Sequence, residues 1–143
     1  MTVLSGYRDT KRMGDGVHPD ILDLLVADNV HIFKGAIVGL AGGYAAPAGG
    51  GCTKVVGVAE SEVDNTVPGH MLGAKRVRVR QGTFKVANSA AADALAIADV
   101  GSLCYAADQT VAKTAGQNLP VAGTVIQFDA DGVWVQMNLD GRR

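Results

Sequence analysis

The stretch Lys75-Arg76-Val77-Arg78-Val79-Arg80 has the most regular pattern in this chain of 143 residues. Successive side chains of a β-strand point to opposite faces of the sheet, so the alternation places three arginines on one face and two valines on the other. The valine face indicates a core, and the arginine face indicates solvent or a partner. We therefore predict a strand that is buried on one side only.

Short apolar or alternating runs lie on both sides of this strand, and glycines separate them. Such runs, bounded by turn residues, are typical of strands. They predict an all-β fold with one or two short helices around a compact β-barrel or β-sandwich core. Gln81-Gly82 is predicted to turn the chain back into a 76–86 hairpin, and Ala130-Asp131-Gly132 to form a second turn. The predicted strands are 30–34, 36–40, 44–47, 54–60, 76–80, 83–87, 102–106, 110–113, 121–128 and 133–137.

The N-terminal part of the chain, 1–28, differs from the rest. Residues 1–20 have no helical or strand period, which indicates an irregular extended arm. Pro19 and the acids that follow favour a short helix over Ile21–Val26, which must pack on this domain or on another subunit because two turns are not stable alone. We thus predict an arm with a short helix at 1–28 and a β-rich core domain at 29–143. The alanine-rich run 89–99 is the main helix candidate, with a loop as the alternative.

A weak internal repeat relates segment 35–57 to segment 101–123 without a gap. Gly35-Ala36-Ile37-Val38 aligns with Gly101-Ser102-Leu103-Cys104, and small or apolar matches continue to Gly57 and Gly123. Both segments have the pattern strand, turn, short strand, glycine-bearing loop, strand. The matches arise by chance in a glycine-rich chain, or they indicate two similar β-units that share one core, with the 76–86 hairpin between them.

Composition excludes several classes of protein. The net charge is −1, 48% of the residues are hydrophobic and 19% are charged. The charge argues against a generic nucleic-acid binder, and the apolar fraction argues against a disordered chain. No apolar run is long enough to span a membrane, and the first residues lack the pattern of a secretory signal. We expect one soluble domain without a membrane partner.

The sequence offers no catalytic set. Cys52 and Cys104 lack a CxxC motif and are interpreted as two buried or half-buried thiols, although their even number also permits a disulfide. The three histidines are scattered, so no metal site is predicted. The acids at 60, 62 and 64 fit a solvated strand end better than a cation site, and the glycine runs lack the features of phosphate loops. We predict no enzyme activity, cofactor or small-molecule substrate.

The arginine strand is the sharpest electrostatic feature. It contacts an acidic partner or phosphates, or its arginines are solvated or paired within the fold. Binding of single-stranded nucleic acid normally needs interleaved aromatic residues, and only Phe84 lies nearby. Trp134 is expected to pack in the core or at a subunit interface.

Several segments, taken in order and spacing over about residues 30–137, resemble one family. They are Ile32–Val38, Gly43–Ala48, Val55–Glu60, Val63–Asn65, Val77–Gly82, Phe84–Ser89, Asp99–Tyr105 and Asp131–Val135. The order of these segments is similar to that in the capsid decoration, or cement, proteins of tailed bacteriophages. Such proteins bind the outside of the capsid shell, often as trimers, and stabilise it against internal DNA pressure.

The resemblance implies a structural virion protein on the capsid surface, made in the cytoplasm of the host bacterium. Its implied partners are the major capsid protein and further copies of itself in a homotrimer, without nucleic acid. The alternatives are another phage head or tail component, such as a head-fibre base, and a small β-barrel that binds single-stranded nucleic acid. The residues predicted to contact the capsid or a neighbouring subunit are Val3, Leu4, Tyr7, Ile21, Leu22, Leu24, Leu25, Arg76, Arg78 and Arg80.

Overall fold

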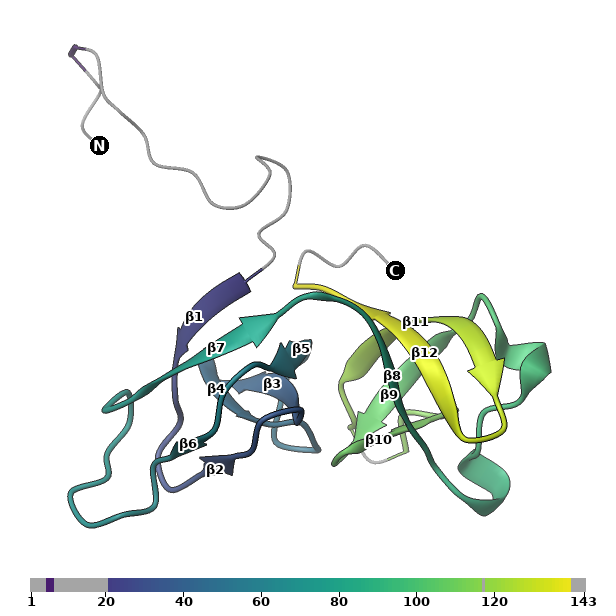
Figure 1. The fold of residues 1–143 in the computed structure, drawn as a ribbon, viewed down its shortest axis with the longest axis horizontal. Coiled ribbons are helices and arrows are strands. Elements are labelled where there is room, and N and C mark those ends of the chain that lie inside the picture. The colour runs from purple at the N-terminus through teal and green to yellow at the C-terminus, as the bar shows by residue number, and fades with distance from the viewer. Residues whose placement is uncertain (1–4, 7–20, 117, 140–143) are drawn as a thin grey trace.

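The chain forms two five-stranded units that follow one another in sequence. A computed structural model describes residues 5–6, 21–116 and 118–139. The first unit spans residues 21–80 and the second spans residues 82–137, and Figure 1 shows the chain passing from β7 of the first into β8 of the second. The strands of the first unit are β1 (Ile21–Leu25), β3 (Ile37–Ala41), β4 (Tyr44–Pro47), β5 (Lys54–Ala59) and β7 (Arg76–Arg80), with a small added pair, β2 (His31–Ile32) and β6 (Val63–Asp64). Those of the second are β8 (Gly82–Asn88), β9 (Leu103–Ala107), β10 (Thr110–Ala112), β11 (Val121–Asp129) and β12 (Gly132–Met137).

The two units have the same strand order. The first is a sheet of order β1-β7-β5-β3-β4, and the second is a closed barrel of order β8-β12-β11-β9-β10. Numbered along each unit, both orders are first, fifth, fourth, second, third. The added pair β2–β6 lies outside this order.

The pairing register repeats as well, at the offset that carries Gly35 onto Gly101. The pair Leu40–Ala45 between β3 and β4 corresponds in this way to Ala106–Val111 between β9 and β10. The same offset relates the β3–β5 ladder to the β9–β11 ladder, including a β-bulge that skips Val56 in one unit and Ala122 in the other. Because bulges are specific local features, their coincidence shows that the repeat in the sequence is a structural duplication.

Both units are closed by parallel contacts. In the second unit, Asn88 pairs with Val111 between β8 and β10. At the equivalent place in the first unit, a single parallel bridge joins Val26 to Ala45. The first unit is thus the less completely closed of the two, and β1 lies at the edge of its sheet.

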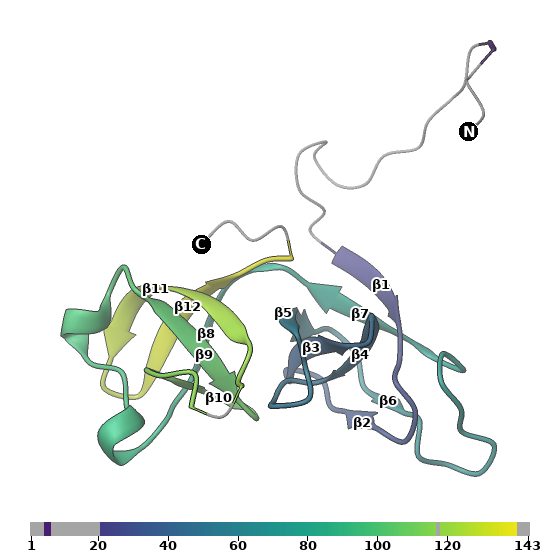
Figure 2. The ribbon, with the colours of Figure 1, turned by 180° about the vertical axis from the view of Figure 1, so that it is seen from behind.

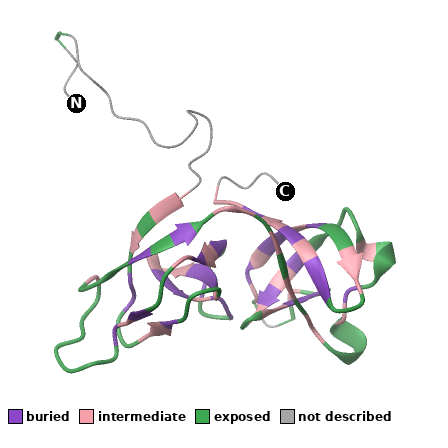
Figure 3. Ribbon diagram, viewed as in Figure 1, coloured by how far each residue is buried: buried purple, intermediate pink, exposed green. Residues whose placement is uncertain are grey.

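Each unit has its own apolar core (Figure 3). The segment between the first and second strands of each unit places one large residue in that core, Ile32 in the first and Leu95 in the second. Asn88 holds Leu95 in place, because its side-chain amide bonds both the N–H and the C=O of Leu95 at 2.9 Å. The other core residues of the first unit are Val26, Val38, Ala45, Val56, Ala59, Val63, Val77 and Val79, and those of the second are Cys104, Ala106, Val111, Ala122, Val125, Val133, Val135 and Met137.

The outer face of β3 and β5 packs against the second unit. Ile37, Ala48 and Val55 are almost fully buried and belong to the second unit's core cluster. The side chain of Gln109, at the turn between β9 and β10, accepts a hydrogen bond of 2.6 Å from the Ile37 N–H and donates one of 3.1 Å to the Ile37 C=O. This contact between the units, which we call the joint, is therefore apolar and contains two specific hydrogen bonds between Gln109 and Ile37.

The all-β prediction is confirmed, and so is the alternation in β7, where Val77 and Val79 are buried and all three arginines are exposed. Two features of the predicted repeat are wrong. The units do not share one core, and residues 76–86 do not form a hairpin. β7 pairs with β1 and β5, whereas β8 pairs with β12 and β10, so both sides of each strand are already occupied (Figures 1 and 2).

The short helix predicted over Ile21–Val26 is also wrong. The segment instead contains β1, because the full length of this strand pairs with β7. Residues 21–28 of the predicted arm therefore belong to the first unit. The 89–99 run contains only two short 3-10 helices, η1 (Ala91–Asp93) and η2 (Ile97–Asp99), on either side of the buried Leu95. Of residues 1–20, only Ser5 and Gly6 are described.

Candidate interaction surface

The outward side of β1 and β7 is the surface on which the predicted residues converge, and we call it the arginine face. It consists of Ile21, Asp23, Leu25, Arg76, Arg78 and Arg80. The two strands pair antiparallel over their whole length, with Asp23 directly opposite Arg78. Because outward and inward side chains alternate together in paired strands, these six residues lie on one side of the sheet.

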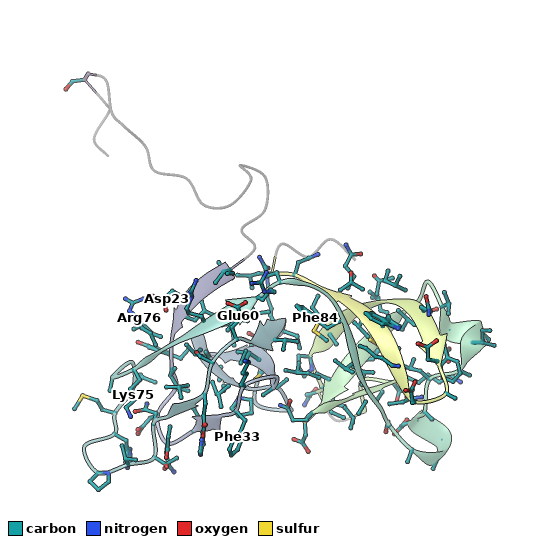
Figure 4. All side chains as sticks on the ribbon, in the orientation of Figure 1. Asp23, Phe33, Glu60, Lys75, Arg76 and Phe84 are labelled. Atoms are coloured by element: carbon teal, nitrogen blue, oxygen red, sulfur yellow. The ribbon has the colours of Figure 1, made fainter. Side chains whose placement is uncertain are left out.

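Two of the three arginines are paired within the fold. Arg76 lies 3.7 Å from the Asp23 carboxylate and donates a 3.3 Å hydrogen bond to the Asp23 C=O. Arg80 donates from Nε to Glu60 Oε1 at 2.6 Å, and a second guanidinium nitrogen also contacts this carboxylate. Figure 4 labels Asp23 beside Arg76 at the outer end of the sheet, with Glu60 nearer the second unit. These exposed pairs hold the side chains in place and contribute little to stability.

Arg78 differs from its neighbours. It is exposed, and its guanidinium makes no hydrogen bond or ion pair with any residue in the described ranges. A guanidinium offers five donors in a planar fork that suits carboxylates. Arg78 is thus the basic group of the arginine face whose hydrogen-bonding capacity is open to an acidic partner.

The residues predicted on β1 divide by their direction. Leu22 and Leu24 are half-buried and pack against the core of the first unit. Ile21 is half-buried and Leu25 is exposed, and both lie on the arginine face. Val3, Leu4 and Tyr7 lie outside the described residues.

Sequence reasoning missed the loop that connects β5 to β7, residues 60–75. The equivalent connection in the second unit is the tight turn Ala130-Asp131. Gly73 lies against Leu25 and the ring of Tyr44, which brings this 60–75 loop to the edge of the sheet. Its exposed apolar side chains are Val67, Met71 and Leu72.

The 60–75 loop is braced from inside. Asn65 is fully buried, and its amide donates to the C=O of Ala27 at 2.8 Å and to the C=O of Met71 at 2.9 Å. His70 Nδ1 lies 2.7 Å from the Asp28 carboxylate. The loop therefore presents its apolar side chains to solvent from a fixed backbone. Residue types alone do not predict the exposure of Met71 and Leu72, since methionine and leucine are usually buried in a core.

The acids at 60, 62 and 64 are engaged with neighbouring residues. Glu60 binds Arg80, and Glu62 lies 2.7 Å from His31 Nε2. Asp64 accepts hydrogen bonds from Thr66, which lower the pKa of the Asp64 carboxyl. Within the described ranges no group of three or more His, Cys, Asp or Glu side chains is placed to hold a metal ion. Cys52 and Cys104 are both buried, as interpreted from the sequence, and burial raises the pKa of the Cys52 thiol.

On the equivalent face of the second unit, the polar side chains pair with other residues of the same unit. There Lys85 lies opposite Trp134, as Asp23 lies opposite Arg78 in the first unit. Lys85 Nζ is 2.7 Å from an Asp131 carboxylate oxygen, and the half-buried Trp134 donates from Nε1 to Asp129 at 3.0 Å. The arginine face thus differs from its duplicate in holding a cation, Arg78, that has no ion-pair partner among the residues that the structure describes.

Replacing Lys85 with glutamine is expected to change how stability depends on pH. The hydrogen bond from Lys85 lowers the pKa of Asp131, and those from Gln127 and Trp134, followed by the charge of Lys85, lower that of Asp129. Carboxyls with lowered pKa stabilise the fold above their unfolded pKa, about 3.9, and lose that contribution as the pH falls through the folded pKa. The melting temperature of the variant should therefore decrease less between pH 6 and pH 3 than that of the wild type. Parallel melting curves would contradict the assignment.

Comparison of the chain with models of protein families, with curated proteins and with solved structures finds no match. Among the described residues, no helix combines the length and the apolar character needed to cross a membrane.

Proposed function

We propose that this protein is a capsid decoration protein of a tailed bacteriophage. It binds the outer surface of the shell, bridges major capsid subunits and associates with further copies of itself as a homotrimer. It is made in the cytoplasm of the host bacterium and resides in the virion. The observation that carries the proposal is the arginine face, where Arg78, which has no ion-pair partner among the described residues, lies between the ion pairs of Arg76 and Arg80.

The structural support lies in the distribution of the residues. Two duplicated β-units place their apolar residues in two cores and one joint, and the first unit presents a charged face. A protein that reinforces a shell needs this combination of a rigid scaffold and an exposed contact surface. The sequence resemblance over residues 30–137 supplies the identity of the partner in this proposal.

Single-stranded nucleic acid is a weaker candidate for the arginine face. Phe84, the aromatic residue nearest to the strand in sequence, packs against the core of the second unit and is not available to stack on bases. Stacking on aromatic side chains supplies much of the affinity of such binding sites.

Arg78→Gln is expected to weaken capsid binding about fivefold at low salt, since an exposed ion pair contributes about 1 kcal/mol or less. The variant's binding should also respond less to added salt, because salt screens charge–charge contacts. The measurement is co-sedimentation with expanded capsids that lack the protein, from the phage whose genome encodes the chain. Lys34→Gln removes an exposed charge elsewhere in the first unit and serves as the matched control.

Two outcomes would contradict the proposal. If the wild-type protein does not co-sediment with capsids at any salt concentration, the proposed function is wrong. If wild type binds and Arg78→Gln binds equally well with the same salt dependence, the arginine face is not the contact surface. A salt-sensitive shift of a labelled oligonucleotide, lost in Arg78→Gln, would favour the nucleic-acid alternative.

A further inference from the structure

We propose that the protein self-associates head to tail, with the second unit of one copy docking on the first unit of the next. This refines the self-association that belongs to the proposed function, but it is derived from the duplication alone. The two units of one chain already form a contact between copies of the same fold. The unit that lies last in the chain has the equivalent of the docking surface and nothing within the described chain to dock on.

The joint within the chain defines the docking surface. The first unit contributes Ile37 and Val55, which are 2% and 0% exposed, and the half-buried Val58. The second unit contributes the turn between β9 and β10. There the Gln109 side chain bonds the backbone of Ile37, and Asp108 lies against Gly49.

The equivalent surface of the second unit is only partly covered, because, of the counterparts of Ile37, Val55 and Val58, Leu103 is exposed and Val121 and Thr124 are half-buried. Leu103 occupies the position of Ile37 but is 43% exposed. Val100 and Ile126 stand where the first unit has Lys34 and Glu60, and they are 44% and 47% exposed. We call these residues, together with Ile97, the apolar end face. η2 and the start of β9 lie at the end of the molecule away from the first unit (Figures 1 and 2).

These exchanges indicate a partner for the apolar end face. Charged residues at the equivalent positions of the first unit show that the fold itself does not require apolar side chains there. Exposed apolar clusters on soluble domains commonly mark contact sites. The cluster surrounds Leu103, the counterpart of the residue at the centre of the joint, so a second copy is the occupant that matches its geometry.

The receiving surface lies on the first unit. The counterpart of the Asp108-Gln109 turn is the exposed turn Gly42-Gly43 between β3 and β4. Tyr44 follows this turn and contacts Gly73, so the 60–75 loop lies beside it. The loop adds Met71 and Leu72, which are 61% and 54% exposed. A heterologous contact of this kind closes into a ring when its rotation permits, and three copies would place six units around that ring.

The test is sedimentation velocity of the full chain over a hundredfold range of concentration. The wild type should associate with increasing concentration. Val100→Lys/Ile126→Glu, which installs the residues of the first unit at the equivalent positions, should weaken association at least about tenfold. Phe33→Asp is the control, because it exchanges an exposed aromatic residue of the first unit for the residue at the equivalent position of the second, Asp99.

A mixing experiment tests the head-to-tail geometry. Leu72→Glu alters the receiving surface, so it should be monomeric alone and should form a one-to-one dimer with Val100→Lys/Ile126→Glu. If Leu72→Glu self-associates like the wild type, the contact is not head to tail and the proposal is wrong.

A monomeric wild type also overturns the proposed self-association. If that monomer still binds capsids, only this inference fails, whereas a protein that associates but does not bind capsids leaves the inference standing and refutes the proposed function. Normal association of Val100→Lys/Ile126→Glu with loss of its capsid binding would assign the apolar end face to the shell and overturn the proposal.

Discussion

Gly57→Ala and Gly123→Ala are each expected to lower the free energy of unfolding by about 3 kcal/mol, at the upper end of what overpacking costs. The two glycines are equivalent in the duplication and occupy the same place beside the bulge of their ladder. A Cβ atom on Gly57 would lie 2.1 Å from the C=O oxygen of Arg80, and one on Gly123 would lie 1.9 Å from that of Gln136. Both atoms are backbone, so the neighbouring strand would have to move.

Chemical denaturation measures this effect, and Gly51→Ala is the matched control. Gly51 is exposed, and a Cβ there would meet no atom within 4 Å, so its substitution should change the unfolding free energy by less than about 0.5 kcal/mol. Equal losses in the two units would follow from the duplication. A loss of less than about 1 kcal/mol at either glycine would show that its strand yields easily, contrary to the close approach in the structure.

Asn65→Ala is expected to cost about 2 kcal/mol of stability, because a buried acceptor that loses its donor costs about 1–3 kcal/mol, and the buried Ala27 C=O and the part-buried Met71 C=O would both lose theirs. The side-chain amide of Asn65 is the group that bonds the C=O of Ala27 and of Met71, and it joins the 60–75 loop to the segment after β1. Without it, the loop has fewer bonds to hold Met71 and Leu72 outward. Hydrogen exchange of the loop amides should therefore speed up along with the loss of stability.

Asn65→Asp makes this test sharper. Aspartate has nearly the same shape but brings a carboxylate toward two carbonyl oxygens and lacks the donor, so it should be at least as destabilising as alanine. Thr66→Ala removes only an exposed hydroxyl that bonds Asp64, and its effect should stay below about 0.5 kcal/mol. An aspartate variant with wild-type stability would refute the role assigned to the amide.

The sequence predicted the parts of the fold whose signal is local. Strand β7 was predictable because the alternation of arginine and valine directly indicates that one face of the strand is buried and the other exposed. The repeat was detectable because small residues recur where strands approach closely, as at Gly57 and Gly123. β1 was mistaken for a helix because the acids after Pro19 suit a first helical turn, whereas pairing with β7 decides its structure.

Other features depend on distant contacts that no local pattern encodes. The prediction of a 76–86 hairpin was wrong because Val77 and Val79 pack in one core, whereas Phe84 and Val86 pack against the other. The arginine face was predicted as a basic strand, but the difference between Arg78 and its neighbours arises from the positions of Asp23 and Glu60, which come from other parts of the chain. The exposed residues of the 60–75 loop were missed because a buried asparagine, not their own types, determines where they point.

The sequential arrangement of the units has a consequence for synthesis on the ribosome. No strand is exchanged between them, and each ladder closes by pairing its first strand with its last, β1 with β7 and β8 with β12. The first unit can thus complete its sheet once Arg80 has left the exit tunnel, while the second is still being translated. During that interval the second unit does not yet bury Ile37, Ala48 and Val55. The nascent chain therefore exposes an apolar, aggregation-prone surface until its second half has emerged and folded.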